Sequence, residues 1–318
     1  MLEFLFKRIH WPKAGKRLAG DNTTGSSPRL AVMSLRDGDG FRDYEELVQE
    51  NLESWDELAH VHAQGSGADF YRISQWLDGE TKLAEWEIEE VGPVSGKALL
   101  HLQCHIGTDT LSWHREGAKV TGIDYSPKAI IEAERFAEII GADDARFLVS
   151  RVCDAADALS GEKFDVLYTG RGALCWLPDI GQWASICRSL VKRGGILYLE
   201  ESTPMLNSMK TYEHDSRFVF GVGYDLFNEE AVSEVSEGSY ADPNWPGKRR
   251  THCWEYRYGS IINALVRNGF KIDFLNERDE VFFNPFPEKF VESRPNYWTF
   301  REGEMRFPLS FTLRATRI

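Results

Sequence analysis

Between Lys97 and Glu201, short and almost continuous apolar runs alternate with longer stretches in which apolar residues recur every three or four positions. The short runs predict buried strands, and the longer stretches predict amphipathic helices. The expected strands span 98–102, 119–124, 145–149, 164–170 and 196–201, and the expected helices span 109–118, 126–142 and 179–195. Alternation of this kind is typical of a parallel sheet with helices on both faces.

The flanking segments follow other patterns. Upstream, the spacing predicts a helix from about Tyr44, a loop carrying aromatic residues over 62–79, and a short acidic helix ended by Gly92 and Pro93. Downstream, residues 202–250 break the rhythm, and a helix over 254–270 and strands over 271–277 and 307–317 follow. No helix is recognisable between these last two strands, so we expect them to be antiparallel neighbours at the sheet edge.

These patterns predict one α/β fold: a Rossmann-like, mostly parallel seven-stranded sheet with helices on both faces. We expect a flexible N-terminal extension over 1–40, a helical cap or lid over 41–96, and the main domain over 97–318. A loop as long as that after the fifth strand is usually functional, so residues 202–254 are expected to be an insertion that covers the substrate.

Composition narrows the class of partner. The formal net charge of −13 excludes a global field that would attract nucleic acid and favours a small or neutral partner. The five cysteines are scattered without a pairing pattern, which indicates a reducing compartment such as the cytoplasm. No apolar run reaches the roughly 20 residues that span a bilayer, so no stable membrane association is expected. The opening "MLEFLFKRIHWPKAGKRLAG" is read as a surface-seeking amphipathic segment or a weakly packed extension.

The turn after the first strand, residues 101–108, carries the candidate chemistry. A dinucleotide site needs G-x-G-x-x-G there, but Gln103 and His105 stand where glycines are expected and only Gly107 remains. Asp124 closes the second strand, and its carboxylate can accept both hydroxyls of a ribose. A ligand with adenine and ribose but no pyrophosphate, such as S-adenosylmethionine, satisfies both observations.

A metal site is the alternative at this turn. His101, Cys104 and His105 supply three nitrogen and sulfur donors. Donors so close in sequence rarely point at one ion without a distant fourth, so no metal is predicted.

Further motifs suggest a family. The chain carries "LLHLQCHIGTDTLSW", "VTGIDYSPKAI", "ALCWLPDI", "GGILYLEE", "GSYADP" and "PLSFTLRAT". Over roughly residues 51–318 it resembles class I S-adenosylmethionine-dependent methyltransferases, specifically a bacterial small-molecule subgroup with an "LLHLQCH-x-G-x-DT" first motif. The resemblance implies methyl transfer from S-adenosylmethionine to an N, O or C atom of a small metabolite by in-line displacement, with S-adenosylhomocysteine as product.

The resemblance also implies a set of cofactor-binding residues. The methionine and ribose would be lined by His101, Gln103, Cys104 and Gly107, and Asp124 would bind the ribose hydroxyls. The adenine would lie against Tyr125 and near Arg151, Val152 and Asp154. The sulfonium would lie near Thr169 and Gly170, and the lid would consist of Trp55, Phe70 and Tyr71. Arg151 departs from the family pattern because a guanidinium cannot accept from the adenine amino group. That contact is therefore expected from the Val152 backbone or from Asp154.

Acceptor-side candidates follow the fourth and fifth strands. We consider His105 and Glu201 as catalytic groups, and Arg171, Trp176, Thr203, Met209 and His252 as substrate-binding residues. Three of these residues have a structural alternative: Arg171 as a loop-packing residue, Trp176 as a core residue and Glu201 as a cap of the sheet edge. Thr203 stands where related enzymes often carry a histidine.

Two other functions remain open from the sequence. One is a nicotinamide-dependent oxidoreductase on the same topology, which the missing glycines disfavour. The other is a non-catalytic S-adenosylmethionine-binding protein. The expected partner is a small-molecule methyl acceptor, with no nucleic acid, and a homodimer is allowed for.

Overall fold

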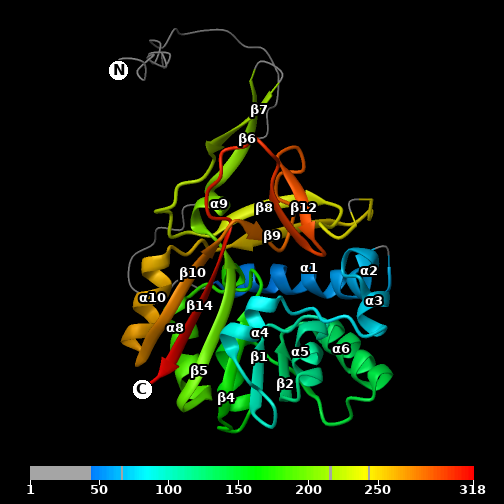
Figure 1. The fold of residues 1–318 in the computed structure, drawn as a ribbon, viewed down its shortest axis with the longest axis vertical. Coiled ribbons are helices and arrows are strands. Elements are labelled where there is room, and N and C mark those ends of the chain that lie inside the picture. Colours follow the sequence, from blue (N-terminus) through cyan, green and yellow to red (C-terminus); the bar gives the residue numbers. More distant parts are fainter. Residues whose placement is uncertain (1–43, 66, 215–216, 243) are drawn as a thin grey trace. The chain divides into compact units, whose positions relative to one another are not determined.

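The computed structural model describes residues 44–65, 67–214, 217–242 and 244–318. The expected extension over 1–40 lies outside the described residues. The main sheet comprises β1 (Ala98–Leu102), β2 (Lys119–Asp124), β3 (Arg146–Val149), β4 (Phe164–Gly170), β5 (Val191–Ser202), β10 (Phe270–Arg278) and β14 (Ser310–Arg317). Their order is β10-β14-β5-β4-β1-β2-β3, as Figure 1 allows the reader to follow.

The first five strands pair in parallel, whereas β14 runs antiparallel between β5 and β10. The mostly parallel seven-stranded fold predicted from the sequence is therefore confirmed, including the antiparallel edge. Parallel strands end at one edge of the sheet, so the segments that follow β1, β2 and β4 meet there.

Alternate residues of each strand enter separate cores on the two faces. Leu100, Leu167 and Leu197 pack under α7 (Ala155–Ala158), α8 (Ile180–Leu190) and α10 (Tyr258–Arg267). Leu99 and Val120 pack under α4 (Glu85–Val91) and α5 (Thr108–Arg115), and α6 (Pro127–Ile140) covers the same face at β3. This two-sided burial explains why the strands read as continuous apolar runs.

Local sequence signals fix two helix starts. Ser126 caps α6, because its hydroxyl accepts a hydrogen bond from the Ala129 backbone N–H at 3.1 Å, and Pro127 occupies the first turn. Asp179 caps α8 in the same way through the N–H groups of Gly181 and Gln182. Both caps place the preceding residues at the edge where the strands end.

Upstream of the sheet lie α1 (Glu45–Gln64), α2 (Gly67–Phe70) and α3 (Ile73–Leu77). The loop predicted over 62–79 is thus wrong in part, because α2 and α3 form there. The buried Trp76 explains α3: its ring packs 5.3 Å from Phe136 on α6, and its Nε1 donates to Ser112 on α5. Tertiary packing, rather than a long periodic pattern, holds this short helix.

The segment after β5 consists of α9 (Pro204–Ser208) and two hairpins, β6–β7 (Met209–His214 and Arg217–Val222) and β8–β9 (Val232–Glu237 and Lys248–Cys253). A further small sheet, which the sequence reading did not identify, contains β11 (Glu280–Val281), β12 (Phe290–Arg294) and β13 (Tyr297–Phe300). In Figure 1, α1 and the β8–β9 hairpin lie across the edge at which β4 and β5 end.

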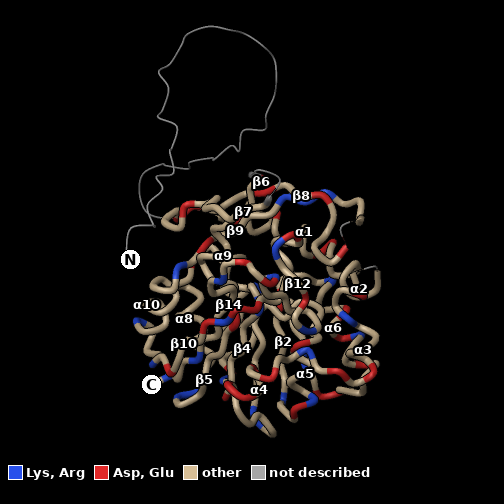
Figure 2. Tube along the Cα trace, turned by 45° about the horizontal axis from the view of Figure 1, so that its top comes forward, with Lys and Arg blue, Asp and Glu red and all other residues tan. Residues whose placement is uncertain are grey.

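Charged residues are distributed over many elements. Figure 2 shows Lys and Arg interspersed with Asp and Glu along the described chain. None of the helices in the described part is both long enough and apolar enough to cross a bilayer.

Candidate cofactor and active site

The turn between β1 and α5 has the backbone shape of a glycine loop, although it is built mostly from other residues. Gln103 and His105 have φ angles of 59° and 47°, in the left-handed region that L residues rarely adopt. Gly107 has φ 77°, and a Cβ there would lie 2.7 Å from the Ala133 Cβ. Gly107 is therefore required, whereas Gln103 and His105 adopt a strained conformation at a cost of about 1–2 kcal/mol each.

Asp124, at the end of β2, lies directly beside this turn. Its two carboxylate oxygens accept hydrogen bonds from the backbone N–H groups of His105 and Ser126, each at 2.9 Å. Burial raises the pKa of Asp124 to about 6. Each oxygen retains acceptor capacity after these bonds, so the carboxylate can bind further hydroxyl donors.

Within the described part of the chain, three buried polar atoms of the predicted cofactor residues have no hydrogen-bond partner. They are Gln103 Oε1, the Tyr125 hydroxyl and Thr169 Oγ1. The other end of the Gln103 amide, Nε2, donates to Ala173 O at 2.9 Å. Since unpaired buried polar groups are rare in folded proteins, these atoms indicate a polar ligand.

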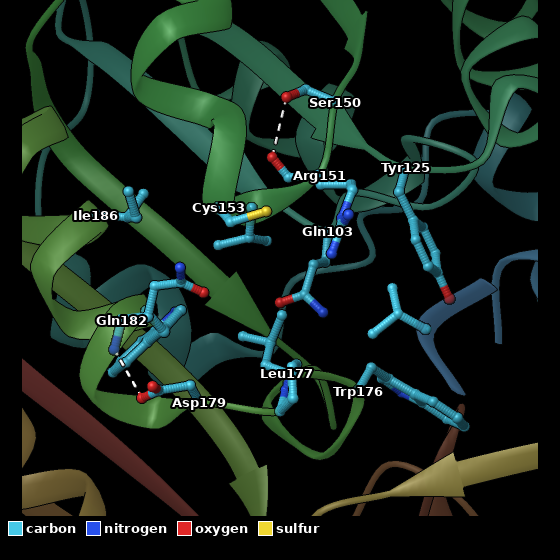
Figure 3. Close-up of a pocket in the computed structure, with 14 residues that line it drawn as sticks. Gln103, Tyr125, Ser150, Arg151, Cys153, Trp176, Leu177, Asp179, Gln182 and Ile186 are labelled. Carbon is cyan, nitrogen blue, oxygen red and sulfur yellow. Dashed lines mark hydrogen bonds between the residues drawn. The ribbon is translucent and has the colours of Figure 1, made fainter. Parts of the chain in front are cut away.

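A small cavity of about 60 Å³ opens beside Gln103 and Tyr125. Its walls are residues 150–153 after β3, residues 176–179 after β4, the adjoining side of α8, and Gln103 and Tyr125. Figure 3 shows Gln103, Tyr125 and Trp176 on one side of it and Gln182 and Ile186 on the other. The cavity thus brings together five of the predicted residues, namely Gln103, Tyr125, Arg151, Val152 and Trp176.

The other predicted adenine contact lies apart from this cavity. Asp154 is exposed and does not line it. Arg151 does line it, but its guanidinium forms a two-pronged ion pair with Glu45 on α1, at 2.7 and 2.9 Å. Arg151 therefore connects the β3 end to α1, and Val48 of α1 completes that wall of the cavity.

Aromatic rings from distant segments gather over the turn. The rings of Trp55 and Tyr71 lie 5.2 and 6.0 Å from the His105 ring. Phe70 lies farther out, stacked on Trp298 at 5.8 Å. Tyr240, from the insertion expected to cover the substrate, joins this cluster, and its hydroxyl hydrogen-bonds to that of Tyr71.

The sequence reading also missed His62, although it is fully buried at this site. His62 Nδ1 lies 2.9 Å from His105 Nε2, within hydrogen-bond distance. The segment that contains it was read in part as a loop, and no motif marked a lone histidine there. Its sequence signal is its position four residues after Leu58, on the apolar face of the helix predicted from Tyr44.

His101 and Cys104 do not converge with His105. The two ring nitrogens of His101 contact Thr110 Oγ1 at 2.8 Å and Gly170 O at 3.3 Å, and burial lowers its pKa to about 4. Cys104 is buried with its thiol toward the His105 carbonyl. Among the described residues, no group of three or more His, Cys, Asp and Glu side chains is arranged to hold a metal ion.

Arg171 lies in a buried ionic cluster. Its side chain is 12% exposed and contacts Glu87 at 2.6 Å and Glu200 at 3.3 Å. Its guanidinium also donates to the Lys82 carbonyl. A substrate carboxylate would have to displace these acidic partners, so the geometry favours the loop-packing alternative.

Glu201 and Thr203 are also engaged by the protein. Glu201 is buried, and its Oε1 accepts the N–H groups of Ala173 and Leu174 at 2.7 and 2.8 Å. Burial raises the pKa of Glu201 to about 8. Thr203 caps α9 through Leu206 N and donates to Pro308 O, so its hydroxyl has a structural role.

The remaining two candidates belong to the hairpins. The His252 ring nitrogens contact Glu50 Oε2 and Ser233 Oγ, each at 2.8 Å, so this histidine joins α1 to β8–β9. Met209 is the half-buried first residue of β6.

Comparison with known proteins agrees with this architecture. A family model described as a methyltransferase domain matches residues 100–197. The curated ubiquinone biosynthesis O-methyltransferase of Erwinia tasmaniensis is 28% identical over 151 residues, which cover 44% of this chain and 61% of the relative. The chain thus spans about three fifths of the length of that relative.

Solved structures share the fold. An S-adenosylmethionine-dependent methyltransferase from Listeria monocytogenes aligns with TM-score 0.53 and 19% identity, over 73% of this chain and 98% of that one. Another from Mesorhizobium loti aligns with TM-score 0.51 and 21% identity, over 76% and 100%. The chain therefore has the fold of class I S-adenosylmethionine-dependent methyltransferases, and part of it is similar to a methyltransferase domain.

Proposed function

We propose that this protein transfers a methyl group from S-adenosylmethionine to an N, O or C atom of a small molecule. The observation that carries the proposal is the turn itself: a glycine-loop backbone at Gln103 and His105, beside Asp124 and a cavity with unpartnered polar atoms. A turn with side chains at these two positions leaves no close backbone approach for a pyrophosphate, which disfavours the nicotinamide alternative.

The cofactor would be held along the edge of the sheet. Asp124 would accept the ribose hydroxyls, and the cavity beyond Tyr125, bounded by Val152, would take the adenine. The unpartnered Gln103 Oε1 and Thr169 Oγ1 would face the methionine portion and the sulfonium, next to Gly170. His101, Cys104 and Gly107 would support this binding by fixing the backbone of the turn.

When bound, the cofactor supplies an activated methyl group on a sulfonium. The protein would then contribute alignment and exclusion of water, which suits the aromatic cluster that contains Trp55, Phe70 and Tyr71. Where the acceptor must lose a proton, His105 is the candidate base, because its ring lies at the cofactor turn and is neutral; burial lowers its pKa to about 3, which makes it a weak base. Glu201, with a pKa raised to about 8, is mostly protonated at neutral pH.

The name of one relative guides the choice of acceptors. The relative from Erwinia tasmaniensis is named as an O-methyltransferase, so oxygen acceptors such as phenols belong first in a test panel. A net charge of −13 supports a small acceptor rather than a nucleic acid, and the five free cysteines support the cytoplasm. We retain a homodimer as part of this proposal.

Isothermal titration with S-adenosylhomocysteine, S-adenosylmethionine and NAD⁺ tests the cofactor. We expect binding of the first two and none of NAD⁺. Incubation with methyl-labelled S-adenosylmethionine and a fractionated small-molecule extract then tests turnover, with label expected in the small-molecule fraction. Tight NAD⁺ binding would favour the oxidoreductase, and cofactor binding without label transfer to any fraction would favour the non-catalytic alternative.

A further inference from the structure

His62 connects three separate parts of the chain at the cofactor turn. It lies on α1 with no exposed surface. Its Nδ1 contacts His105 Nε2 at 2.9 Å, and its Nε2 contacts Ser239 Oγ at 2.9 Å, in the loop that joins β8 to β9. The buried Ser239 thus reaches the turn through the two imidazoles in series.

The hydrogen bonds must run in one direction through His62, and the tautomer sets which direction that is. A neutral imidazole has one N–H and one acceptor nitrogen, so His62 must donate through one nitrogen and accept through the other. Burial lowers the pKa of His62 to about 2 and that of His105 to about 3, so both rings are neutral. The ring of Tyr240, 5.0 Å from that of His62, encloses the pair.

Residue 105 needs such a constraint. Its φ of 47° lies in the left-handed region, where a glycine would remain without a penalty and a histidine would not. Its backbone N–H donates to Asp124 and its ring contacts His62 at hydrogen-bond distance, beside the rings of Trp55 and Tyr71. If residue 105 returned to a right-handed or extended conformation, the N–H would leave the carboxylate that is proposed to bind the ribose.

We propose that His62 is a positioning residue for the cofactor turn, holding the His105 ring so that residue 105 keeps the backbone conformation of the glycine it replaces. The proposal rests on the proposed function, since it assumes that this turn binds the cofactor. It makes the affinity for the cofactor depend on α1 and, through Ser239, on the β8–β9 hairpin.

A double-mutant cycle on His62 and His105 tests this role. The variants are His62→Ala, His105→Gly and the double variant, and the measurement is the Kd of S-adenosylhomocysteine by titration calorimetry. We expect His62→Ala to weaken binding about tenfold. Without His62, the free energy needed to place His105 in the left-handed conformation is subtracted from the free energy of binding. Since a glycine needs no support at this position, His62→Ala should have less than about a twofold effect in the His105→Gly background.

The controls separate positioning from general damage. His60→Ala changes an exposed histidine on the same helix and should bind as the unchanged protein does. His62→Asn retains an amide N–H that can donate to His105 and should recover part of the loss; it replaces His62→Ala in the cycle if that variant does not fold. Thermal unfolding of each variant establishes that it is folded.

Two results would overturn the proposal. One is normal binding of S-adenosylhomocysteine by His62→Ala. The other is a double variant that binds about tenfold more weakly than His105→Gly, which would indicate that His62 acts only through the packing of α1. Absence of S-adenosylhomocysteine binding by the unchanged protein would instead refute the proposed function.

Discussion

Asp124 binds the turn and is proposed to bind the ribose with the same carboxylate. Because burial raises its pKa to about 6, the group changes charge within an accessible pH range. Ribose hydroxyls donate to the ionised form, so protonation below pH 6 removes an acceptor. Its role in binding can therefore be separated from its role in folding by varying pH.

We predict that Asp124→Asn weakens S-adenosylhomocysteine binding by about 1–3 kcal/mol at pH 7.5, as expected for losing hydrogen bonds to a charged group. In the unchanged protein, affinity should fall as the pH decreases through about 6, whereas the variant should show little of this dependence. Titration calorimetry between pH 5 and 8 measures both. Asp154→Asn, at the exposed acidic residue outside the cavity, is the control, and equal losses in the two variants would argue against the ribose assignment.

Arg171 illustrates what the sequence leaves undecided for a single residue. Its position after β4 was predictable, but its partner Glu87 lies 84 positions earlier on α4 and cannot be paired with it by pattern. The same limit applies to His62 and His105, which are 43 positions apart. Strand ends and turn spacing locate a site, while side-chain pairing depends on packing that a single sequence does not encode locally.

Replacing Arg171 by Met should leave Glu87 and Glu200 buried without their cation. We expect the free energy of unfolding to fall by about 3 kcal/mol or more, measured by urea denaturation, because breaking one partner of a buried ion pair is costly. Further replacement of Glu87 by Gln should recover part of this loss. A folded Arg171→Met protein of normal stability that had lost turnover would favour the substrate-binding role instead.

At the scale of elements, α1 and the β8–β9 hairpin form one joint over the site. The Asn51 side chain donates to the His252 carbonyl and accepts from the His252 N–H, both at 2.8 Å. The Asn51 amide thus satisfies the backbone N–H and carbonyl of His252 on β9, as a neighbouring strand would. Asn51 and His252 are both buried. These bonds therefore join α1 to the insertion after β5.

We predict that Asn51→Ala loosens this joint while the main sheet stays intact. Removal of the amide leaves a buried N–H and a buried carbonyl without partners, at about 1–3 kcal/mol each. Hydrogen exchange at His252 should accelerate at least tenfold, with unchanged protection in β1 and β4. Gln49→Ala, at an exposed position of α1, should leave exchange unaltered; uniform acceleration across the sheet would mean that the joint is part of the global fold.

Element by element, predictability followed the strength of periodic pattern. The five parallel strands and α6 are confirmed because burial on both faces and clear caps produce long signals. The helices α2 and α3 and the sheet β11–β13 were missed, since each element has five residues or fewer and is held by tertiary contacts.

At the scale of the whole molecule, the carboxyl-end edge of the sheet combines a ligand site with buried ionisable groups. Burial raises the pKa of Glu200 and of Glu201 to about 8, from 4.5 when unstructured. A folded state that retains a proton the unfolded chain has released becomes less stable as pH rises. The buried Glu200 and Glu201 therefore reduce the free energy of unfolding around neutral pH. Buried ionisable groups at functional sites commonly reduce stability in this way.

Glu201→Gln tests this for one group. Between pH 4.5 and 8 the folded protein binds one more proton at Glu201 than the unfolded chain, so this residue lowers the free energy of unfolding by about 1.4 kcal/mol per pH unit as pH rises. Gln keeps an oxygen for the N–H groups of Ala173 and Leu174 but does not titrate. The stability of the variant relative to the unchanged protein should therefore increase steadily from pH 5 to 7.5 in urea denaturation. Glu302→Gln, which removes an exposed acidic group, serves as the matched control. Parallel pH profiles for the unchanged protein and Glu201→Gln would show that Glu201 is ionised in the folded state throughout, and would restore it as a candidate base.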